Sequence, residues 1–221
     1  MRMRNEIDVH LIATTTHGRV LVREAHAAAA RGMLVGFHGY MEHAAIQMQR
    51  LESIPETRRW RLVSIQALHR FYRGRTQDVV ASWMTREDRD AAIADNIEYV
   101  DAALDAIPHD PGGRIVFVGF SQGVAMAFRA ALRGRRDAAG VIAVGGDVPP
   151  ELLTDRHAVF PSVLLARGTR DEWLTAEAFR RDLNALSTRK PGARVRGHEF
   201  DGAHEWNEAV SEAAADFLAS L

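Results

Sequence analysis

The sequence predicts an α/β fold in which a mostly parallel, twisted sheet carries helices on both faces and an antiparallel hairpin at its N-terminal end. Short apolar runs that are typical of buried strands alternate with segments of helical apolar periodicity, and this alternation favours parallel strands joined by crossover helices. The chain has 221 residues, of which 47% are hydrophobic, and this is enough for one substantial core. No repeat, low-complexity block or long linker interrupts it, so residues 1–221 are expected to form a single domain.

The predicted elements follow one another in a regular order. Residues 6–13, EIDVHLIA, and residues 19–25, RVLVREA, flank the polar turn TTTHG and are expected to pair as the hairpin. Further strands are expected where apolar runs stop at glycine or polar residues, over 32–39, 60–68, 114–120, 140–146, 162–168 and 193–200. Helices are expected over 43–54, 86–107, 122–132, 172–187 and 205–220. The segment 69–83, HRFYRGRTQDVVASW, is expected to be a loop.

The composition excludes several kinds of site and partner. With 28 basic and 29 acidic residues the net charge is −1, so nothing in the overall charge attracts nucleic acid or anionic lipid. The absence of cysteine excludes disulfides, thiolate nucleophiles and cysteine–zinc sites. No apolar run approaches the roughly 18 residues of a membrane span. The N-terminal stretch is charged and lacks the apolar core of a signal peptide, so a cytoplasmic location is expected.

Polar residues follow several of the predicted strands at the point where each strand ends. They are His38, Ser121, Asp147, Asp171 and His204. Because the carboxyl ends of parallel strands meet at one edge of a sheet, these side chains are expected to lie along that edge. A serine, a histidine and a carboxylate are the residue types that build a nucleophile, its base and the group that orients the base.

Ser121 lies in the motif G-F-S-Q-G, where a predicted strand gives way to a helix. A sharp turn at such a point exposes the serine hydroxyl above the sheet. Gly119 and Gly123 are explained by the close passage of strand and helix, which leaves no space for side chains. The N–H groups at the start of the helix favour a developing negative charge. The motif therefore predicts a nucleophilic serine, with a plain structural turn as the alternative.

The base and the acid are predicted from their order along the chain. His204 is the predicted base and Asp171 the predicted acid, because Ser–Asp–His is the order expected for a nucleophile on this kind of turn. Asp147 competes for the role of acid, since it also follows a strand. Asp171 is favoured because it follows the later strand. His38 is expected to brace its loop by hydrogen bonding rather than to transfer protons.

Metal and cofactor sites are not predicted. The pairs His38 with His43 and His198 with His204 have spacings that metal ligands can have, but neither pair comes with a convincing third ligand. The triad chemistry needs no cofactor.

Several motifs resemble those of a known family. They are GFHGY at 36–40, SWMTREDRDAAIADNIEYV at 82–100, GFSQGVAMAFRAAL at 119–132, GTRDEW at 168–173 and DGAHEW at 201–206. Together they resemble the α/β-hydrolase-fold serine esterases of the phospholipase/carboxylesterase group, which is close to the acyl-protein thioesterases. One position and one loop depart from the family pattern. Val124 stands where a second glycine often follows GFSQG, and the usual HGLGD-like loop is HGYMEHA.

The resemblance implies a carboxylesterase that acts through an acyl-enzyme on Ser121, with His204 and Asp171 completing the triad. It also implies an oxyanion hole made by the backbone N–H groups of Tyr40 and Gln122. An acyl thioesterase or a lysophospholipase would use the same triad, and an amidase or peptidase is a less favoured alternative. A non-catalytic binding protein on this scaffold is expected to lack a triad member, whereas all three are present here.

The substrate pocket is expected to be lined by Tyr40, Met41, Phe71, Trp83, Asp147, Val148 and Trp173. In this hypothesis the loop 69–83 caps the pocket, and Trp83 walls the acyl side. The arginines of the loop, Arg70, Arg73 and Arg75, either meet an anionic group of the substrate or are solvated surface side chains. The expected partner is a small-molecule ester, and the oligomeric state, monomer or homodimer, stays open.

Overall fold

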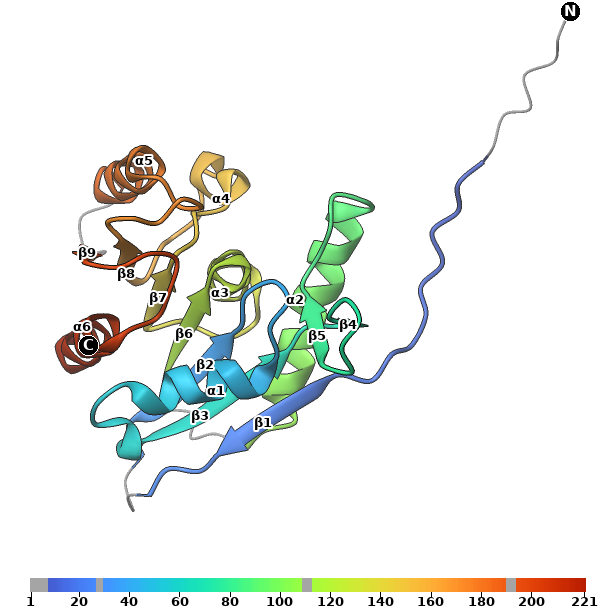
Figure 1. Cartoon of the computed structure of the whole chain (residues 1–221), viewed down its shortest axis with the longest axis horizontal. Helices are drawn as coiled ribbons and strands as arrows, with labels where there is room; N and C mark the ends of the chain where they lie inside the picture. Colours follow the sequence, from blue (N-terminus) through green and yellow to red (C-terminus); the bar gives the residue numbers. More distant parts are fainter. Residues whose placement is uncertain (1–7, 27–29, 109–112, 190–193) are drawn as a thin grey trace, which may run out of the picture.

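A seven-stranded sheet in the order β1-β3-β2-β6-β7-β8-β9 runs through the computed structural model, which describes residues 8–26, 30–108, 113–189 and 194–221 (Figure 1). β1 pairs with β3 in antiparallel fashion, and the other neighbours in this sheet pair in parallel. This arrangement confirms the predicted mostly parallel sheet with an antiparallel element at its N-terminal end. The strands are β1 (Arg19–Arg23), β2 (Gly32–Phe37), β3 (Trp60–Gln66), β6 (Arg114–Phe120), β7 (Gly140–Val144), β8 (Ser162–Gly168) and β9 (Val195–Phe200).

Helices cover both faces of the sheet because the central strands are apolar on both sides. Along β2, for example, Met33 and Val35 face one hydrophobic cluster while Leu34 faces another. α1 (Ala44–Ser53) and α6 (Glu208–Ser220) cover the Leu34 face, where the short η1 (Thr57–Arg59) precedes β3. The opposite face carries α2 (Arg89–Asp105), α3 (Gln122–Arg133), α4 (Pro150–Thr154) and α5 (Ala176–Ser187).

The N-terminal strand has a different partner from the one predicted. β1 forms within the second predicted strand, but it pairs with β3, placing Arg19 opposite Gln66. Residues 6 and 7 lie outside the described residues, and residues 8–18 carry no strand. At the start of β1, the Tyr99 hydroxyl on α2 accepts the Arg19 N–H at 2.9 Å and donates to its carbonyl at 3.1 Å. The backbone groups of Arg19 are thus bonded to a helix, where the prediction had a strand before β1.

The segment 69–83 is not a loop, as the sequence suggested, but mainly a β-hairpin. β4 (His69–Tyr72) and β5 (Val79–Ser82) pair in antiparallel register, with Phe71 opposite Val80. Arginines interrupt the apolar alternation in the sequence, which concealed the strands. Ala81 forms an isolated antiparallel bridge with Glu42, so the hairpin is attached to the loop that follows β2.

Close packing of backbone against backbone fixes the junction of β6 and α3. A Cβ atom placed on Gly123 would lie 2.1 Å from the Phe37 carbonyl oxygen at the end of β2, and one on Gly119 would lie 2.5 Å from the Gly123 carbonyl oxygen. Neither neighbour is a flexible side chain that could move aside. The two glycines therefore let the helix start directly against two strands.

We expect Gly123→Ala to lower the free energy of unfolding by about 3 kcal/mol, because the added methyl group forces backbone segments apart. Urea denaturation would measure the change. Gly74→Ala is the matched control: Gly74 has φ +52, but a Cβ atom placed on it would meet nothing within 4 Å, so only the conformational cost of about 1 kcal/mol applies. Equal losses in the two variants would contradict the packing argument.

Candidate active site

Ser121 occupies the sharp turn between β6 and α3, with φ 53 and ψ −120. A positive φ is strained for a residue with a side chain, so the surrounding structure must hold it. The Ser121 N–H donates to the Val144 carbonyl at 2.8 Å, and the Ser121 carbonyl accepts the Val124 N–H at 3.0 Å. The turn is thus fixed on both sides, to β7 and to the first turn of α3.

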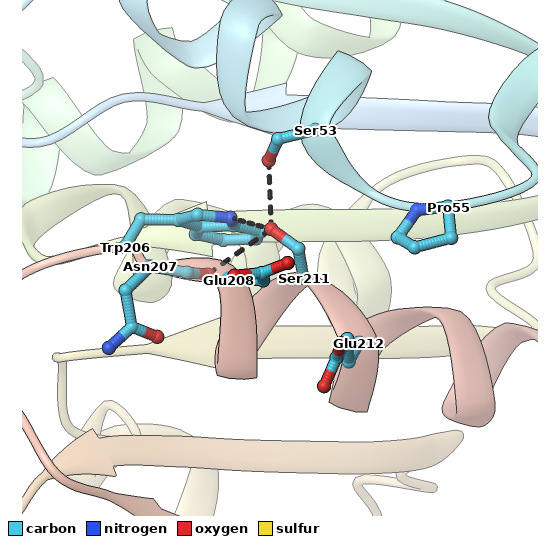
Figure 2. A pocket seen from close by; sticks show the side chains of 7 residues that line it. All are labelled: Ser53, Pro55, Trp206, Asn207, Glu208, Ser211 and Glu212. Atoms are coloured by element: carbon cyan, nitrogen blue, oxygen red, sulfur yellow. Dashed lines mark hydrogen bonds between the residues drawn. The ribbon is translucent and has the colours of Figure 1, made fainter.

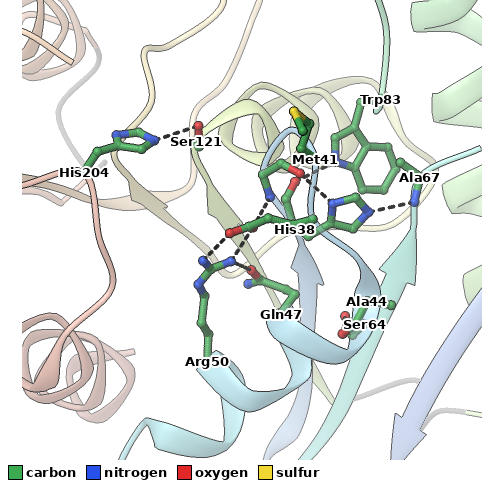
Figure 3. A network of polar contacts seen from close by, with 12 residues as sticks. His38, Met41, Ala44, Gln47, Arg50, Ser64, Ala67, Trp83, Ser121 and His204 are labelled. Atoms are coloured by element: carbon green, nitrogen blue, oxygen red, sulfur yellow. Dashed lines mark hydrogen bonds and ion pairs between the residues drawn. The ribbon is translucent and has the colours of Figure 1, made fainter. Parts of the chain in front are cut away.

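The structure brings the side chains of Ser121, His204 and Asp171 together. His204 Nε2 lies 2.9 Å from Ser121 Oγ, and His204 Nδ1 lies 2.9 Å from Asp171 Oδ2 (Figure 3 shows the His204–Ser121 link). Since a carboxylate only accepts, Nδ1 carries the proton it donates to Asp171, and Nε2 is left to accept the serine proton. This is the geometry in which a histidine can act as the base for a serine hydroxyl.

The Asp171 carboxylate is itself held in place. Its Oδ1 accepts the N–H groups of Trp173 at 2.8 Å and Leu174 at 3.0 Å, and its side chain is only 1% exposed. Asp147, the competing acid in the sequence analysis, is exposed and makes no hydrogen bond to His204 in the part of the chain that the structure describes. The geometry thus favours Asp171 as the orienting acid.

Aromatic rings flank the imidazole of His204. The Phe120 ring lies 5.1 Å from it and the Trp173 ring 6.3 Å, measured between centroids. Phe120 is buried, whereas Trp173 is 83% exposed. The imidazole therefore has one buried aromatic neighbour and one that borders the solvent.

The two backbone N–H groups expected to form an oxyanion hole are free to do so. Around Tyr40, the Gly39 N–H donates to Glu42 Oε2 at 2.7 Å and the Met41 N–H donates to the Ala81 carbonyl at 3.1 Å. Among the described residues, neither the Tyr40 N–H nor the Gln122 N–H has an acceptor. An anionic oxygen above Ser121 could accept both.

His38 braces the peptide that carries the Tyr40 N–H. Its Nδ1 donates to the Gly39 carbonyl at 2.7 Å, and its Nε2 accepts the Ala67 N–H at 3.1 Å (Figure 3). Burial lowers the pKa of His38 from 6.5 to about 4, so the ring is neutral at pH 7 and can donate at one nitrogen while accepting at the other. Because the C=O and N–H of a trans peptide point in opposite directions, holding the Gly39 carbonyl directs the Tyr40 N–H away from His38.

The Gln122 side chain connects the serine turn to the hairpin, a role that sequence reasoning missed. Gln122 Oε1 accepts the Trp83 N–H at 3.0 Å, and Nε2 donates to the Met84 carbonyl at 3.0 Å. From the hairpin, Arg73 donates to the Met41 carbonyl at 2.8 Å. The only sequence signal was the position of Gln122 inside G-F-S-Q-G.

The predicted pocket residues divide into exposed and buried groups. Tyr40 is 55% exposed, and its ring lies 6.0 Å from that of the half-buried Phe71 on the hairpin. Trp173 lies beside the His204 ring, and Met41, next to Tyr40 in the chain, is half-buried. Val148 is buried, and its N–H donates to Asp182 Oδ2 at 2.8 Å.

The expectation that Trp83 walls the acyl pocket needs correction. Its side chain is fully buried in the core, where its ring packs edge-on against Phe37 at 5.5 Å. Its Nε1–H donates to the His38 carbonyl at 2.8 Å, so Trp83 supports the loop after β2 from the core side. The sequence showed a tryptophan near the site but not the direction in which its side chain points.

Two of the three hairpin arginines bind backbone carbonyls. Arg70 donates to the His17 carbonyl at 2.8 Å, and Arg73 donates to that of Met41, as described above. Arg75 is exposed. These contacts favour a structural role for Arg70 and Arg73 over the recognition of an anionic substrate group.

Outside the Ser121–His204–Asp171 group, the described residues form a hollow but no metal-ligand cluster and no membrane-spanning helix. A hollow of about 350 Å³ lies between the end of α1 and the start of α6, beside Trp206 and Ser211 (Figure 2). In the described ranges, no three His, Asp or Glu side chains come together as metal ligands would. No helix among those residues is both long and apolar enough to cross a membrane.

The chain matches a known protein family in sequence and several known esterases in fold. A family model described as phospholipase/carboxylesterase matches residues 76–221. Among curated proteins, none matches the sequence significantly. The solved structure of esterase PE8 shares 23% identity over 93% of this chain and 99% of its own, with a TM-score of 0.68. Zea mays acyl-protein thioesterase 2 shares 16% identity over 92% and 99%, with a TM-score of 0.71. The Bacillus cereus carboxylesterase shares 17% over 92% and 94%, with a TM-score of 0.68. At these identities the structures demonstrate a shared α/β-hydrolase fold.

We expect the buried neutral His38 to make stability depend on pH. The unfolded chain binds this proton near pH 6.5, whereas the folded chain binds it only near pH 4. The stabilisation is therefore complete above pH 6.5 and is lost as the pH falls toward 4, at a total cost of roughly 3 kcal/mol. Urea denaturation at pH 7 and pH 5 would measure it. His38→Asn should reduce the difference between the two pH values by about 2 kcal/mol, and an unchanged difference would contradict the prediction.

Proposed function

Because the chain belongs to the phospholipase/carboxylesterase family of esterase-type hydrolases, we propose that it hydrolyses carboxylic esters through an acyl-enzyme formed on Ser121. The observation that carries this proposal is the hydrogen-bonded series Asp171–His204–Ser121, with 2.9 Å at each of its two links. A serine hydroxyl is a weak nucleophile until a base takes its proton, and this arrangement supplies the base and the group that orients it.

In the first half of the reaction, Ser121 Oγ attacks the ester carbonyl carbon as its proton passes to His204 Nε2. The new C–O bond forms while the carbonyl π electrons move to the oxygen. Asp171 holds the imidazole by accepting from Nδ1 and stabilises the imidazolium that results. The tetrahedral intermediate then collapses, the bond to the alcohol oxygen breaks, and His204 returns the proton to the leaving alcohol.

The oxygen of the tetrahedral intermediate accepts hydrogen bonds from the Tyr40 and Gln122 N–H groups. Gln122 is the first residue of α3, so its N–H also lies at the positive end of the helix dipole. Loss of one such donor typically costs about 3 kcal/mol of transition-state stabilisation. The same two groups serve the second half of the reaction, in which His204 activates a water that releases the acid and restores Ser121.

The surroundings of the site support a substrate with an apolar group. Trp173 lies beside His204, and Tyr40 and Phe71 form an aromatic pair at the loop whose Tyr40 N–H is the expected oxyanion donor; Tyr40 and Trp173 are largely exposed. Aromatic side chains at a site rim favour contact with an acyl chain or an apolar alcohol. An acyl thioester would pass through the same steps, with a thiolate in place of the alkoxide. The shared fold with an acyl-protein thioesterase supports that substrate as the second candidate.

We expect the purified protein to hydrolyse p-nitrophenyl esters and Ser121→Ala to lower kcat by at least about 10⁴-fold. The rate of p-nitrophenol release along a series from acetate to palmitate would measure activity and the preferred acyl length, and matching acyl thioesters would test the second candidate. Circular dichroism would show that the variant remains folded. Substantial activity in folded Ser121→Ala would contradict the proposal.

We expect Asp171→Asn to lower kcat by about 10⁴-fold, because the amide no longer holds the correct imidazole tautomer. Asp147→Asn, at the competing strand end, should change kcat by less than about tenfold. The two variants would be compared on the best ester of the series. A larger loss in Asp147→Asn would reverse the assignment of the acid.

A further inference from the structure

Glu42 closes the loop of residues 39–42, called here the oxyanion loop. Its Oε2 accepts the Gly39 N–H at 2.7 Å and one N–H of Arg50 at 2.6 Å, while its Oε1 accepts a second N–H of Arg50 at 2.6 Å. Both side chains are mostly buried, with 18% of Glu42 and 13% of Arg50 exposed. Burial alone would raise the pKa of Glu42, but the Arg50 guanidinium and the Gly39 N–H outweigh it and hold this pKa below its ordinary value. Glu42 and Arg50 therefore form a bidentate ion pair.

The oxyanion loop needs such support because its backbone is strained. Met41 has φ 58, in the left-handed region that favours glycine, and it stands where the HGLGD-like family loop has a glycine. A strained backbone keeps its conformation only when neighbouring contacts over-determine it. On the β5 side the Ala81 carbonyl accepts the Met41 N–H, and the Ala81 N–H donates to the Glu42 carbonyl at 2.8 Å. On the α1 side the support comes from the Glu42–Arg50 pair.

Arg50 also contacts the other half of the site. Its guanidinium carbon lies 3.9 Å from the centre of the Phe120 ring, and the His204 ring lies 5.1 Å from the same ring between centroids. Phe120 directly precedes Ser121. Figure 3 shows Arg50 and Gln47 reaching from α1 toward the loop that carries Met41. One guanidinium thus contacts both the oxyanion loop and Phe120, the last residue of β6 before the nucleophile.

The last turn of α1, which carries Arg50, is also hydrogen-bonded to the chain segment after His204. Ser53 Oγ lies 2.8 Å from Ser211 Oγ on α6, and Ser211 Oγ accepts the Trp206 Nε1–H at 2.9 Å (Figure 2). α1 therefore contacts the oxyanion loop through Arg50 and the region of the base through Ser53. Because α1 is attached to both regions, the backbone that carries Arg50 is fixed relative to the oxyanion loop.

We propose that Glu42 and Arg50 are positioning residues for acyl transfer, which hold the Tyr40 N–H at the place where the oxyanion forms without touching the substrate. The inference rests on the proposed function. A backbone donor stabilises the transition state only when it already points at the developing charge. Loosening the pair frees the Gly39 N–H and lets the strained Met41 relax, and the Tyr40 peptide lies between these two residues.

The test compares wild type, Glu42→Gln and Arg50→Lys with p-nitrophenyl butyrate as substrate and an alkyl trifluoromethyl ketone as inhibitor. The ketone forms a tetrahedral adduct with Ser121 whose oxyanion occupies the same hole. We expect Glu42→Gln to lower kcat about 10- to 100-fold while KM changes less than about threefold. The affinity for the ketone should fall by about the same factor as kcat. Arg50→Lys keeps the charge but not the bidentate geometry, so we expect its kcat to fall about 3- to 10-fold. The double variant should be little worse than Glu42→Gln, because the two residues act as a unit.

A matched control separates positioning from general stability. Arg129 on α3 donates from Nε and Nη2 to Glu151 Oε1 of α4, at 2.9 and 2.6 Å, so Glu151→Gln breaks another arginine–glutamate pair with a buried guanidinium. Glu151→Gln should lower the thermal midpoint while leaving kcat and the ketone affinity within about twofold of wild type. An equal loss of kcat in Glu151→Gln would overturn the inference, because the effect would then be one of stability.

The outcomes also separate this inference from the proposed function. If wild type is active, Ser121→Ala is inactive, and folded Glu42→Gln keeps its kcat and ketone affinity, the positioning role is overturned while the esterase proposal stands. If p-nitrophenyl butyrate is not turned over, the rate of Ser121 labelling by a fluorophosphonate, whose phosphoryl oxygen enters the same hole, replaces kcat as the readout. A wild type that reacts with neither probe overturns both proposals.

Discussion

The backbone turn at Ser121 is the constraint on which the rest of the structure depends. A positive φ at a serine is unfavourable, so the turn requires contacts from several directions. β7 supplies the Val144 carbonyl, and β2 passes so close that position 123 has no space for a side chain. Position 146 is equally confined, because a Cβ atom placed on Gly146 would lie 2.5 Å from the Ser121 carbonyl oxygen. The parallel sheet order, with β2, β6 and β7 side by side, makes these contacts available.

A second layer of support consists of buried polar groups with fixed directions. His38, Trp83 and the Gln122 side chain all direct their hydrogen bonds to backbone groups beneath the site. Buried polar groups are costly unless they are paired, so each pairing strongly favours one local arrangement. The result is that loop backbone, usually mobile, is held rigidly beside the nucleophile. The hairpin β4–β5 and helix α1 support this loop from two sides.

The pattern of the chain was sufficient to predict the sheet and the residues at its carboxyl edge. Apolar runs separated by helical periodicity determine which segments become parallel strands, because both faces of those strands must be buried. Ser121, Asp171 and His204 then follow from their places after strands and from the spacing of G-x-S-x-G. The chain also predicted that His38 would brace its loop by hydrogen bonding, and its contacts with the Gly39 carbonyl and the Ala67 N–H agree with that role.

Only the tertiary structure decided the contacts between segments that are distant in sequence. Asp171 was already favoured over Asp147 by its place along the chain, but the 2.9 Å contact between its Oδ2 and His204 Nδ1 depends on how the end of β8 packs against the His204 loop. Other contacts also depend on packing between distant segments. They are the pairing of β1 with β3, the inward direction of Trp83, the hairpin in 69–83 and the Glu42–Arg50 pair. Local apolar periodicity fixes whether a residue is buried and in what element, because it reports one segment at a time. Which groups then meet depends on how several elements pack at once, and no single segment of the sequence carries that information.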